Sequence, residues 1–313
     1  MNSTPLVSVI VPVHNVAPYL RNCADSLLRQ TLTDIEIIFI NDASTDNSYD
    51  ILKEYAQKDL RVILINNEIN IKTAETRNKG IELARGEYVG FVDGDDYVDE
   101  NFFEELYKIA KEKDADIAKS IVREWKGNRQ LRESSNKKIE TNGKFFFFSQ
   151  VWSAIYRRDL LEKHNIRYHV DFFCLQIQAV YYANKVVCTD KTAYNYVRHD
   201  DSCDSPCFTL EKWKRLNLGH ANFIYTWIQN HEYTEYEKSL YLDRVRFLYF
   251  YGYNRLEKKD VAKACHILAD NIKKYYHCFL PTSNIKKLRR ILYLMNQKIS
   301  NNDFVKAMLL RKI

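Results

Sequence analysis

Three carboxylates lie within four residues of one another in the segment Asp93-Gly94-Asp95-Asp96. They follow directly after the apolar run 88–92, which predicts a buried strand. Carboxylates this close repel one another and raise each other's pKa unless a cation lies among them. A short acidic loop suits Mn²⁺ or Mg²⁺, which keep water ligands and accept a substrate's phosphates. The alternative is a solvated acidic turn before the predicted helix 101–111.

The elements that must position these carboxylates follow from an alternation of two hydrophobic periods over the first 120 residues. Short apolar runs alternate with stretches that carry an apolar stripe at helical spacing. Continuous apolar strands separated by amphipathic helices are typical of a parallel sheet covered on both faces. The predicted strands are 8–13, 35–40, 62–65 and 88–92, and the predicted helices are 19–30, a segment capped by Ser44 or Asp46, and 73–84.

Polar side chains gather where these strands end. Pro12, Val13 and Asn15 follow the first strand, and Asn41-Asp42-Ala43-Ser44 follows the second. In open α/β sheets, ligands bind outside the carboxyl ends of the strands. We therefore expect these segments and the acidic turn to form one site.

Beyond residue 116 the pattern is weaker. Residues 116–122 predict a further strand, 123–141 a mobile loop, 145–148 a core strand and 152–164 a helix. From Leu210 the chain is rich in Tyr, Leu and Lys at helical spacing, which predicts an α-helical subdomain. No segment reaches the ~20 apolar residues of a transmembrane helix.

Four segments in this order and spacing resemble glycosyltransferase family 2, the inverting nucleotide-sugar transferases of GT-A fold. They are 7–15 (VSVIVPVHN), 40–46 (INDASTD), 76–80 (TRNKG) and 84–96 (ARGEYVGFVDGDD). A weaker similarity to capsule and lipopolysaccharide transferases of that family covers 151–161 and 194–202. The resemblance implies an α/β fold with a Rossmann-like, mostly parallel sheet flanked by helices. It divides the chain into a donor-binding half (1–122), an acceptor-side half (123–205) and a helical C-terminal subdomain (206–313).

The resemblance also implies roles for single residues. Asp42 would accept a hydrogen bond from the uracil of a UDP-sugar, and Asp95 would bind the metal that bridges the diphosphate. His199 matches a position that helps to hold the metal or diphosphate, although a lone His in a polar loop is often inert. The other implied donor-binding residues are Pro12, Val13, Asn15, Arg77, Asp93, Gly94 and Arg198.

The general base and the acceptor site are less clearly implied. Inverting transfer needs a base that takes the proton from the acceptor hydroxyl. The family supplies it from a Glu-Asp pair, but the aligned pair here is Asp171-Phe172, so Phe stands at the usual base position. We predict Asp171 as the catalytic base, reached by a one-residue slip; the alternatives are that Asp171 only orients the acceptor or that the base lies elsewhere. Asp96 is predicted as an acceptor ligand. Trp152 would either stack on an acceptor sugar or belong to the core.

Two smaller departures from the family lie on the donor side. Ala43 replaces a usual glycine, and Asn70-Ile71-Lys72 stands where relatives often have a flexible glycine. Both suggest a stiffer rim around the donor.

Charge is divided unevenly along the 313 residues. The net charge is +6, while residues 281–313 hold 8 basic residues and one acid, or +7, which leaves −1 for the rest. In 285–313 the basic residues lie opposite an apolar stripe, so this tail could bind an anionic membrane surface or pack on the subdomain. The basic residues do not surround the acidic site, which disfavours nucleic-acid binding.

Seven scattered cysteines and the lack of a signal-like N-terminus predict a cytoplasmic protein. It would be peripheral on the inner face of the cell membrane if the tail binds there.

These observations favour a metal-dependent, inverting hexosyl- or N-acetylhexosaminyl-transferase. It would move a sugar from a UDP-sugar to a hydroxyl of a growing bacterial surface polysaccharide or lipid-linked glycan. The alternative is a catalytically impaired nucleotide-sugar-binding partner of another transferase, which Phe172 supports. A nucleotide-dependent oxidoreductase is disfavoured because no GxGxxG follows the first strand.

Overall fold

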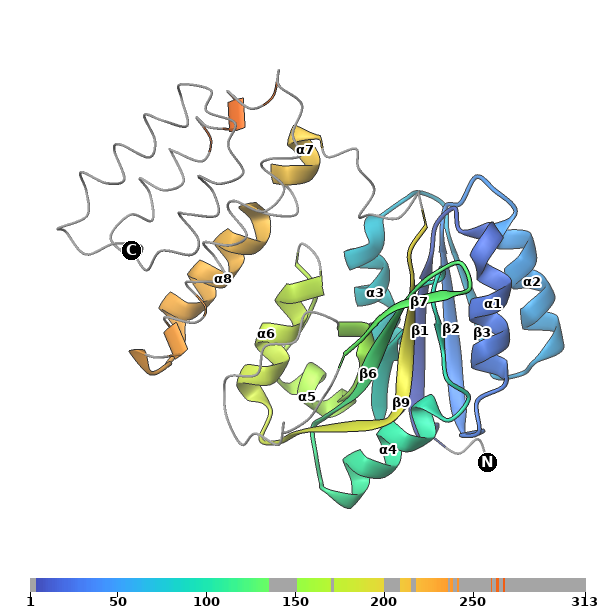
Figure 1. The fold of residues 1–313 in the computed structure, drawn as a ribbon, viewed down its shortest axis with the longest axis horizontal. Coiled ribbons are helices and arrows are strands. Elements are labelled where there is room, and N and C mark those ends of the chain that lie inside the picture. The colour runs from blue at the N-terminus through green and yellow to red at the C-terminus, as the bar shows by residue number, and fades with distance from the viewer. Residues whose placement is uncertain are drawn as a thin grey trace. The chain divides into compact units, whose positions relative to one another are not determined.

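The computed structural model describes residues 4–134, 151–169, 172–199, 209–214 and 218–235, together with Glu237, Lys238, Tyr241, Asp260, Lys263, Ala264 and Ile267. The chain divides into two compact units, 1–202 and 203–313, and each is described by itself (Figure 1). The sequence boundary at 205/206 lies close to this division, while the boundary at 122/123 falls inside a strand of the first unit.

The first unit begins with the predicted alternation of strands and helices. Strands β1 (Val7–Val13), β2 (Ile35–Asp42), β3 (Val62–Asn67) and β4 (Tyr88–Phe91) are parallel, in the order β3-β2-β1-β4. Helices α1 (Ala17–Leu28), α2 (Ser48–Lys58) and α3 (Lys72–Leu83) connect them. All residues of β2 are buried, as expected for a strand covered on both faces. The prediction for this region is confirmed within a few residues at each boundary.

The sheet continues from β4 in mixed orientation through β8 (Ala154–Arg157), β6 (Ile117–Lys126), β9 (Val186–Val197) and β5 (Tyr97–Val98). β7 (Arg129–Glu133) pairs with β6, which makes nine strands among the described residues. The helical elements of this half are α4 (Phe102–Glu112), the 3₁₀ turn η1 (Val151–Ser153), α5 (Arg158–Lys163) and α6 (Phe172–Tyr182).

Two sequence predictions in this half are wrong. Of the expected loop at 123–141, the described residues 123–134 hold instead the end of β6 and the whole of β7, a hairpin whose β7 residues are all exposed, while 135–141 lie outside the described residues. Both faces of β7 contact solvent, so its sequence shows no alternation of apolar and polar residues. The expected helix at 152–164 is η1, β8 and only then α5. β8 is short and buried between β4 and β6, where cross-strand pairing overrides helical spacing. The predicted strand 145–148 lies outside the described residues.

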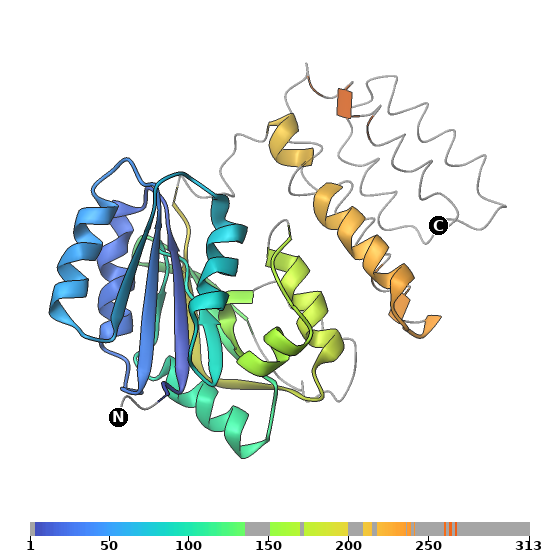
Figure 2. The same ribbon diagram turned by 180° about the vertical axis from the view of Figure 1, so that it is seen from behind.

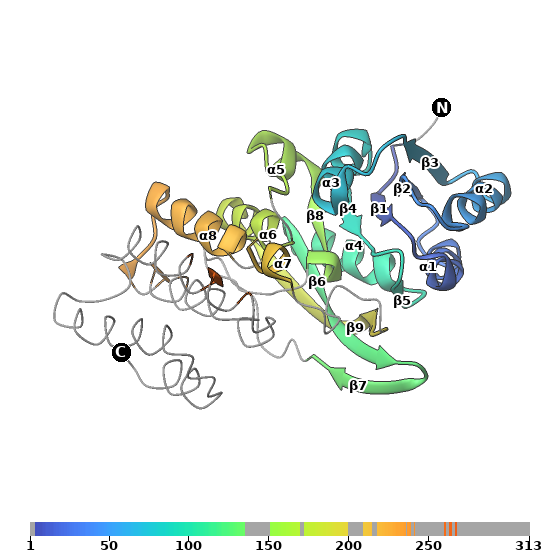
Figure 3. The same cartoon turned by 90° about the horizontal axis from the view of Figure 1, so that it is seen from above.

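The helices cover both faces of the sheet (Figures 2 and 3). Two glycines mark close contacts on opposite faces. A Cβ on Gly80 of α3 would lie 2.4 Å from the Ile10 side chain, and one on Gly90 would lie 2.7 Å from Phe103 of α4. Ile10 pairs with Phe91, while Val9 pairs with Gly90. Because paired residues share a face, α3 and α4 lie on opposite sides of the sheet.

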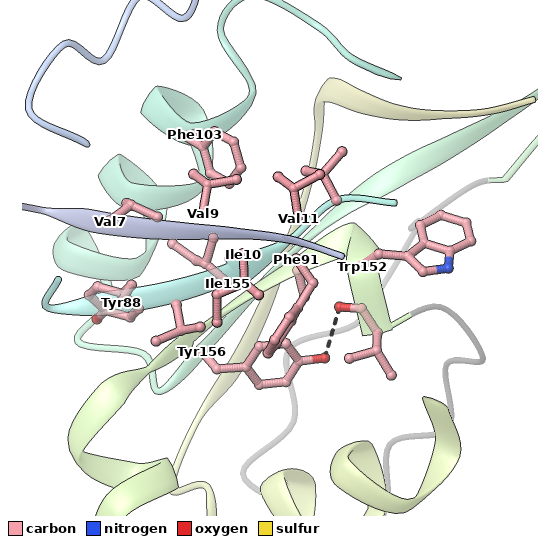
Figure 4. Close-up of a cluster of buried hydrophobic side chains, with 14 of the residues drawn as sticks. Val7, Val9, Ile10, Val11, Tyr88, Phe91, Phe103, Trp152, Ile155 and Tyr156 are labelled. Carbon is pink, nitrogen blue, oxygen red and sulfur yellow. Dashed lines mark hydrogen bonds between the residues drawn. The ribbon is translucent and has the colours of Figure 1, made fainter. Parts of the chain in front are cut away.

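The core lies between the sheet and these helices (Figure 4). It includes Val7, Val9, Ile10 and Val11 of β1, each fully buried. From β8, Tyr156 is buried, and its hydroxyl donates to the Val151 carbonyl at 3.1 Å. The packing of β1 at the centre of the sheet fixes where its carboxyl end emerges.

In the second unit the described elements are α7 (Leu210–Trp213) and α8 (Gly219–Asn230). α8 buries one stripe, with Ala221, Ile224 and Ile228 within it. These elements agree with the predicted helical subdomain. The basic tail 285–313 lies outside the described residues, and within the described part no helix is long and apolar enough to cross a membrane.

Candidate active site at the carboxyl ends of the strands

The parallel strands bring the predicted site segments to one edge of the sheet. Val13 at the end of β1 pairs with Asn41 near the end of β2, and Ile10 pairs with Phe91 at the end of β4. The segments that follow, 13–16, 42–46 and 92–96, therefore emerge together. Gly94 permits this approach, because a Cβ there would lie 3.1 Å from Val16 and 3.3 Å from the Pro12 carbonyl oxygen.

The loops after β1 and β2 hold each other in place. The Asn15 side-chain oxygen accepts a hydrogen bond from the Thr45 backbone N–H at 2.7 Å, and the Asn15 N–H donates to Ser44 Oγ at 3.1 Å. Asn15 has φ 54° and Ala43 has φ 52°. The left-handed conformation at 43 explains why glycine is usual there, since a Cβ in that region costs about 1–2 kcal/mol.

Asp42 lies at the floor of this edge, 3% exposed. Its Oδ1 accepts hydrogen bonds from Asn67 Nδ2 at 3.0 Å and the Ile71 N–H at 2.9 Å, and its Oδ2 accepts one from the Lys72 N–H at 2.9 Å. A carboxylate offers about four acceptor positions, so one on Oδ2 is left. Asp42 thus ties the 70–72 segment to β2, with Lys72 in the left-handed region at φ 75°. Its contact with a nucleobase stays a prediction.

Arg77 lies buried beneath the acidic turn and forms an ion pair with Asp93, the first carboxylate of that turn, whose side chain is 19% exposed. Arg77 on α3 is 1% exposed and its guanidinium donates to Asp93 Oδ1. The guanidinium also lies 5.3 Å from the ring centroid of Tyr168. Burial raises the pKa of Asp93, Arg77 opposes that effect, and Asp95 adds to it. The sequence placed both residues near the donor, and the structure pairs them directly.

Asp96 is 1% exposed and faces protein. Its Oδ2 accepts a hydrogen bond from the Tyr194 hydroxyl at 2.8 Å and its Oδ1 one from the Val197 N–H at 2.7 Å. The Tyr194 oxygen in turn accepts the Asp93 N–H at 3.0 Å. Burial, followed by the charges of Asp95 and Asp93, raises the pKa of Asp96 well above its usual range. Asp96 thus anchors β9 beneath the turn in this structure, and its acceptor role stays a prediction.

Asp95 is the carboxylate of the turn that meets an imidazole. Its Oδ2 lies 2.8 Å from His199 Nε2, although the two residues are 104 positions apart. The His199 side chain is 10% exposed, and its ring stacks on Tyr19 of α1 with centroids 4.3 Å apart. His199 is therefore a fixed part of the site and not a solvated loop residue. The structure brings together the two residues that the sequence assigned to the metal.

The donor atoms available here suit a divalent cation held jointly with a substrate. Within the part of the chain that the structure describes, His199 Nδ1 is buried without a hydrogen-bond partner, and Asp95 keeps 27% of its side chain exposed. Among the described residues, no three His, Cys, Asp or Glu side chains form a group that could hold a metal alone. One carboxylate and one imidazole leave coordination positions for water and phosphate oxygens, as Mg²⁺ and Mn²⁺ require.

The remaining predicted residues lie around this centre. Arg198 is half exposed and pairs with Glu124, and its N–H donates to the Trp125 carbonyl at 2.8 Å. Trp152 is 9% exposed and packs on Tyr194, with ring centroids 4.0 Å apart, so the core alternative describes its place in this structure. Asp171 lies outside the described residues.

Sequence reasoning missed the positioning roles of three residues, Tyr19, Tyr194 and Asn78. Tyr19 and Tyr194 are described above. On α3, Asn78 makes two hydrogen bonds of 2.9 Å to the Tyr168 backbone, one through each end of its amide. This pair fastens the segment before residue 170 to the helix that carries Arg77. Asn78 and Tyr194 carried a signal, because they lie inside the segments 76–80 and 194–202 that resemble the family, whereas Tyr19 carried none.

A sequence model of the family described as "Glycosyl transferase family 2" matches residues 8–182, more than half of the chain. The chain belongs to this family. The resemblance in the sequence predicted this family.

Known proteins agree with this assignment. The chain is 36% identical over 216 residues to the uncharacterized glycosyltransferase EpsJ of Bacillus subtilis (strain 168), over 63% of this chain and 62% of EpsJ. The chain therefore spans less than two thirds of that relative. S. aureus TarS 1–349 in complex with UDP-GlcNAc superposes with a TM-score of 0.71 at 22% identity, over 94% of this chain and 88% of that one. Mannosyltransferase PcManGT from Pyrobaculum calidifontis, in complex with GDP-Man and Mn²⁺, superposes with a TM-score of 0.59 at 14% identity, over 98% of this chain and 85% of that one. These two structures establish the GT-A fold.

Proposed function

We propose that this glycosyltransferase transfers a sugar from a UDP-sugar, with inversion and with a divalent metal, to a hydroxyl of a growing glycan. The observation that carries the proposal is the pairing of Asp95 with His199, next to the Arg77–Asp93 ion pair, at the carboxyl ends of parallel strands. This edge is where α/β sheets bind nucleotides. The UDP-GlcNAc complex of TarS, a protein with the same fold, supports a uridine donor.

The residues of this chain divide the work of donor binding. Pro12, Val13 and Asn15 would contact the base, and the remaining acceptor position of Asp42 Oδ2 would take the uracil imide N–H. Arg77 holds the Asp93 carboxylate toward the ribose side of the donor. A bound Mn²⁺ or Mg²⁺, held by Asp95 and His199, would supply charge stabilisation for the nucleoside diphosphate leaving group.

Further donor and acceptor contacts complete the proposal. Gly94 keeps the acidic turn close to Pro12, and Arg198 would add a permanent positive charge at the rim. Transfer with inversion requires a base that removes the acceptor hydroxyl proton as the hydroxyl attacks the anomeric carbon. Asp171 is our candidate base, and Asp96 and Trp152 our candidate acceptor-side residues. A hexose or an N-acetylhexosamine is the proposed transferred sugar.

The proposed acceptor is a bacterial surface polysaccharide, of capsule or lipopolysaccharide type, or a lipid-linked glycan. The sequence similarity of 151–161 and 194–202 to transferases of such polymers supports this choice. Lipid-linked acceptors are made at the cytoplasmic leaflet, where the +7 tail 285–313 would hold a cytoplasmic enzyme at the membrane surface. No nucleic-acid partner is proposed.

The test is UDP release from a panel of UDP-sugars with Mn²⁺, for the wild-type protein and for Asp95→Asn. We expect slow release with at least one donor, its loss in Asp95→Asn, and an unchanged circular dichroism spectrum. Equal turnover of both proteins at saturating Mn²⁺ would refute the metal assignment. Measurable UDP binding with no hydrolysis or transfer for any donor and acceptor would favour the catalytically impaired partner, to which Phe172 at the usual base position points.

A further inference from the structure

The β6–β7 hairpin projects from the rest of the sheet (Figure 3). Its residues 123–133 are rich in charged side chains. Residues 126–133, which include the turn, are all exposed. The turn itself uses Gly127 at φ 54°, where a Cβ would meet no other atom within 4 Å. The hairpin is therefore a surface feature that contributes little to the core.

The register of the hairpin sorts its charges onto two faces. Lys126 lies opposite Arg129, Trp125 opposite Gln130, Glu124 opposite Arg132 and Arg123 opposite Glu133. Successive pairs alternate between faces, and the register shift between Glu124 and Trp125 brings Arg132 onto the face of Arg129.

One face is neutralised and the other is not. Arg123 pairs with Glu133 at 3.0 Å on the first face. The second face, which we call the cationic face, holds Lys126, Arg129 and Arg132, with Arg198 paired to Glu124 next to them. Four cations and one carboxylate give this face a charge of +3.

The cationic face is arranged for a ligand and not for stability. Lys126 and Arg129 are directly opposite each other, and like charges in that position destabilise a hairpin. Within the described part of the chain neither residue, nor Arg132, forms an ion pair. An anionic ligand would supply the missing negative charge.

The cationic face leads directly into the active site. The Arg198 N–H donates to the Trp125 carbonyl at 2.8 Å, which joins the hairpin to the end of β9. The next residue, His199, contacts Asp95. A chain held on the cationic face would therefore pass next to the acidic turn.

We propose that the cationic face binds the acceptor, and that the acceptor is a polymer with repeated negative charges, either phosphodiesters or carboxylates. This inference rests on the proposed function, because it names the acceptor class of that site. An anionic membrane fits less well, since Leu131 is the one large apolar side chain of 126–133 that is exposed, too little for insertion. A glycan fits better than a nucleic acid because the face adjoins a site for sugar transfer.

The test compares binding of labelled polymers by fluorescence anisotropy at 50 and 300 mM salt, without donor or metal. The probes are polygalacturonate for carboxylates, poly(glycerol phosphate) for phosphodiesters and dextran of equal length as the uncharged reference. DNA and vesicles of phosphatidylglycerol represent the two disfavoured ligands. The hairpin variant is Lys126→Gln/Arg129→Gln/Arg132→Gln. The control variant, Lys58→Gln/Lys108→Gln/Lys163→Gln, removes the same charge from exposed positions elsewhere. A variant that keeps the charge, Lys126→Arg/Arg129→Lys/Arg132→Lys, checks that charge and not folding is decisive.

We expect the wild-type, control and charge-keeping proteins to bind one anionic polymer, more weakly at high salt, and the hairpin variant to bind it about 10- to 100-fold more weakly. The polymer that binds identifies the charge source. Equal binding by the hairpin and control variants would overturn the proposal. So would equal binding of dextran, or wild-type binding confined to DNA or to vesicles of phosphatidylglycerol.

UDP release with donor alone separates this inference from the proposed function. Normal release together with polymer binding that ignores the hairpin would refute the acceptor proposal only. Hairpin-dependent binding without UDP release from any donor, either alone or together with the bound polymer, would refute the transferase proposal and keep the polymer-binding surface.

Discussion

Replacing Lys119 by Met should stabilise the protein at neutral pH and lose that benefit as the pH rises. Lys119 lies in β6, 3% exposed, with Nζ donating to the Ser120 carbonyl at 2.9 Å. Burial lowers its pKa from 10.5 to about 8. Cys188, its partner residue in β9, is no counter-ion, because burial raises the pKa of that thiol to about 11.

The magnitude follows from the difference in pKa between the folded and unfolded chain. The pKa of Lys119 falls from 10.5 to about 8 on folding. This difference lowers the free energy of unfolding by about 3 kcal/mol at any pH where the lysine is charged in both the folded and the unfolded chain. Loss of the hydrogen bond to Ser120 returns about 1 kcal/mol. The Met variant should therefore be about 2 kcal/mol more stable at pH 7.

The sign of the pH dependence is fixed by proton binding. Between pH 8 and 10.5 the unfolded chain binds more protons at Lys119 than the folded chain, so the wild-type protein gains stability with rising pH. Below pH 8 the penalty is fully present, and above 10.5 it is absent. The advantage of Lys119→Met should shrink from pH 8 upward and reverse near pH 10.

Urea unfolding at pH 7, 8, 9 and 10 measures this difference. Lys108→Met, at an exposed position on α4, is the matched control and should show no pH-dependent change in the free energy of unfolding. The reasoning fails if the difference between Lys119→Met and the wild-type protein is constant from pH 7 to 10, or if the variant is less stable at pH 7.

Three further substitutions test the fold and the site. Gly80→Ala should destabilise the protein by about 1–3 kcal/mol in urea unfolding, because its Cβ would meet Ile10 Cγ2. Adding Ile10→Leu, which lacks that branch, should recover part of the loss. Additive losses in the double variant would contradict the contact. Tyr19→Leu should weaken Mn²⁺ binding in the presence of UDP about tenfold, measured by electron paramagnetic resonance. Tyr19→Phe keeps the stack on His199 and should keep the Mn²⁺ affinity. An equal loss of Mn²⁺ affinity in both variants would assign the effect to the hydroxyl. Asp171→Asn should keep UDP affinity by calorimetry and lower transfer about 10²- to 10⁴-fold, and a mild effect would place the base elsewhere.

The first half of the fold could be predicted because its information is local. Continuous apolar strands and striped helices between residues 7 and 92 give both the parallel sheet and its carboxyl edge, and these place Asp42 and the acidic turn together. The helix 152–164 was wrong because four residues of β8 are too short a run to outweigh helical spacing. The hairpin was missed because β7 contacts water on both faces.

The contacts that define the site could not be predicted in the same way. Tyr19 meets His199 across 180 positions, and Tyr194 meets Asp96 across 98. No periodic pattern encodes such pairs, since each depends on how β9 passes the end of β4. The resemblance to the family located His199, but not the ring on which it stacks.

The same contacts decide how the site is divided between the halves of the first unit. The acidic turn belongs to the donor half by sequence, yet the partners of its carboxylates include Tyr194, Val197 and His199 of the later half. If these partners were absent, Asp96 would be a carboxylate beside two others with no donor to its oxygens, and the repulsion would favour an open, solvated turn. The alternative interpretation of the acidic turn as a solvated loop therefore fails because of β9. The observed contacts of these carboxylates require the sheet to be complete through that strand, and the sequence motifs before residue 122 do not supply them alone.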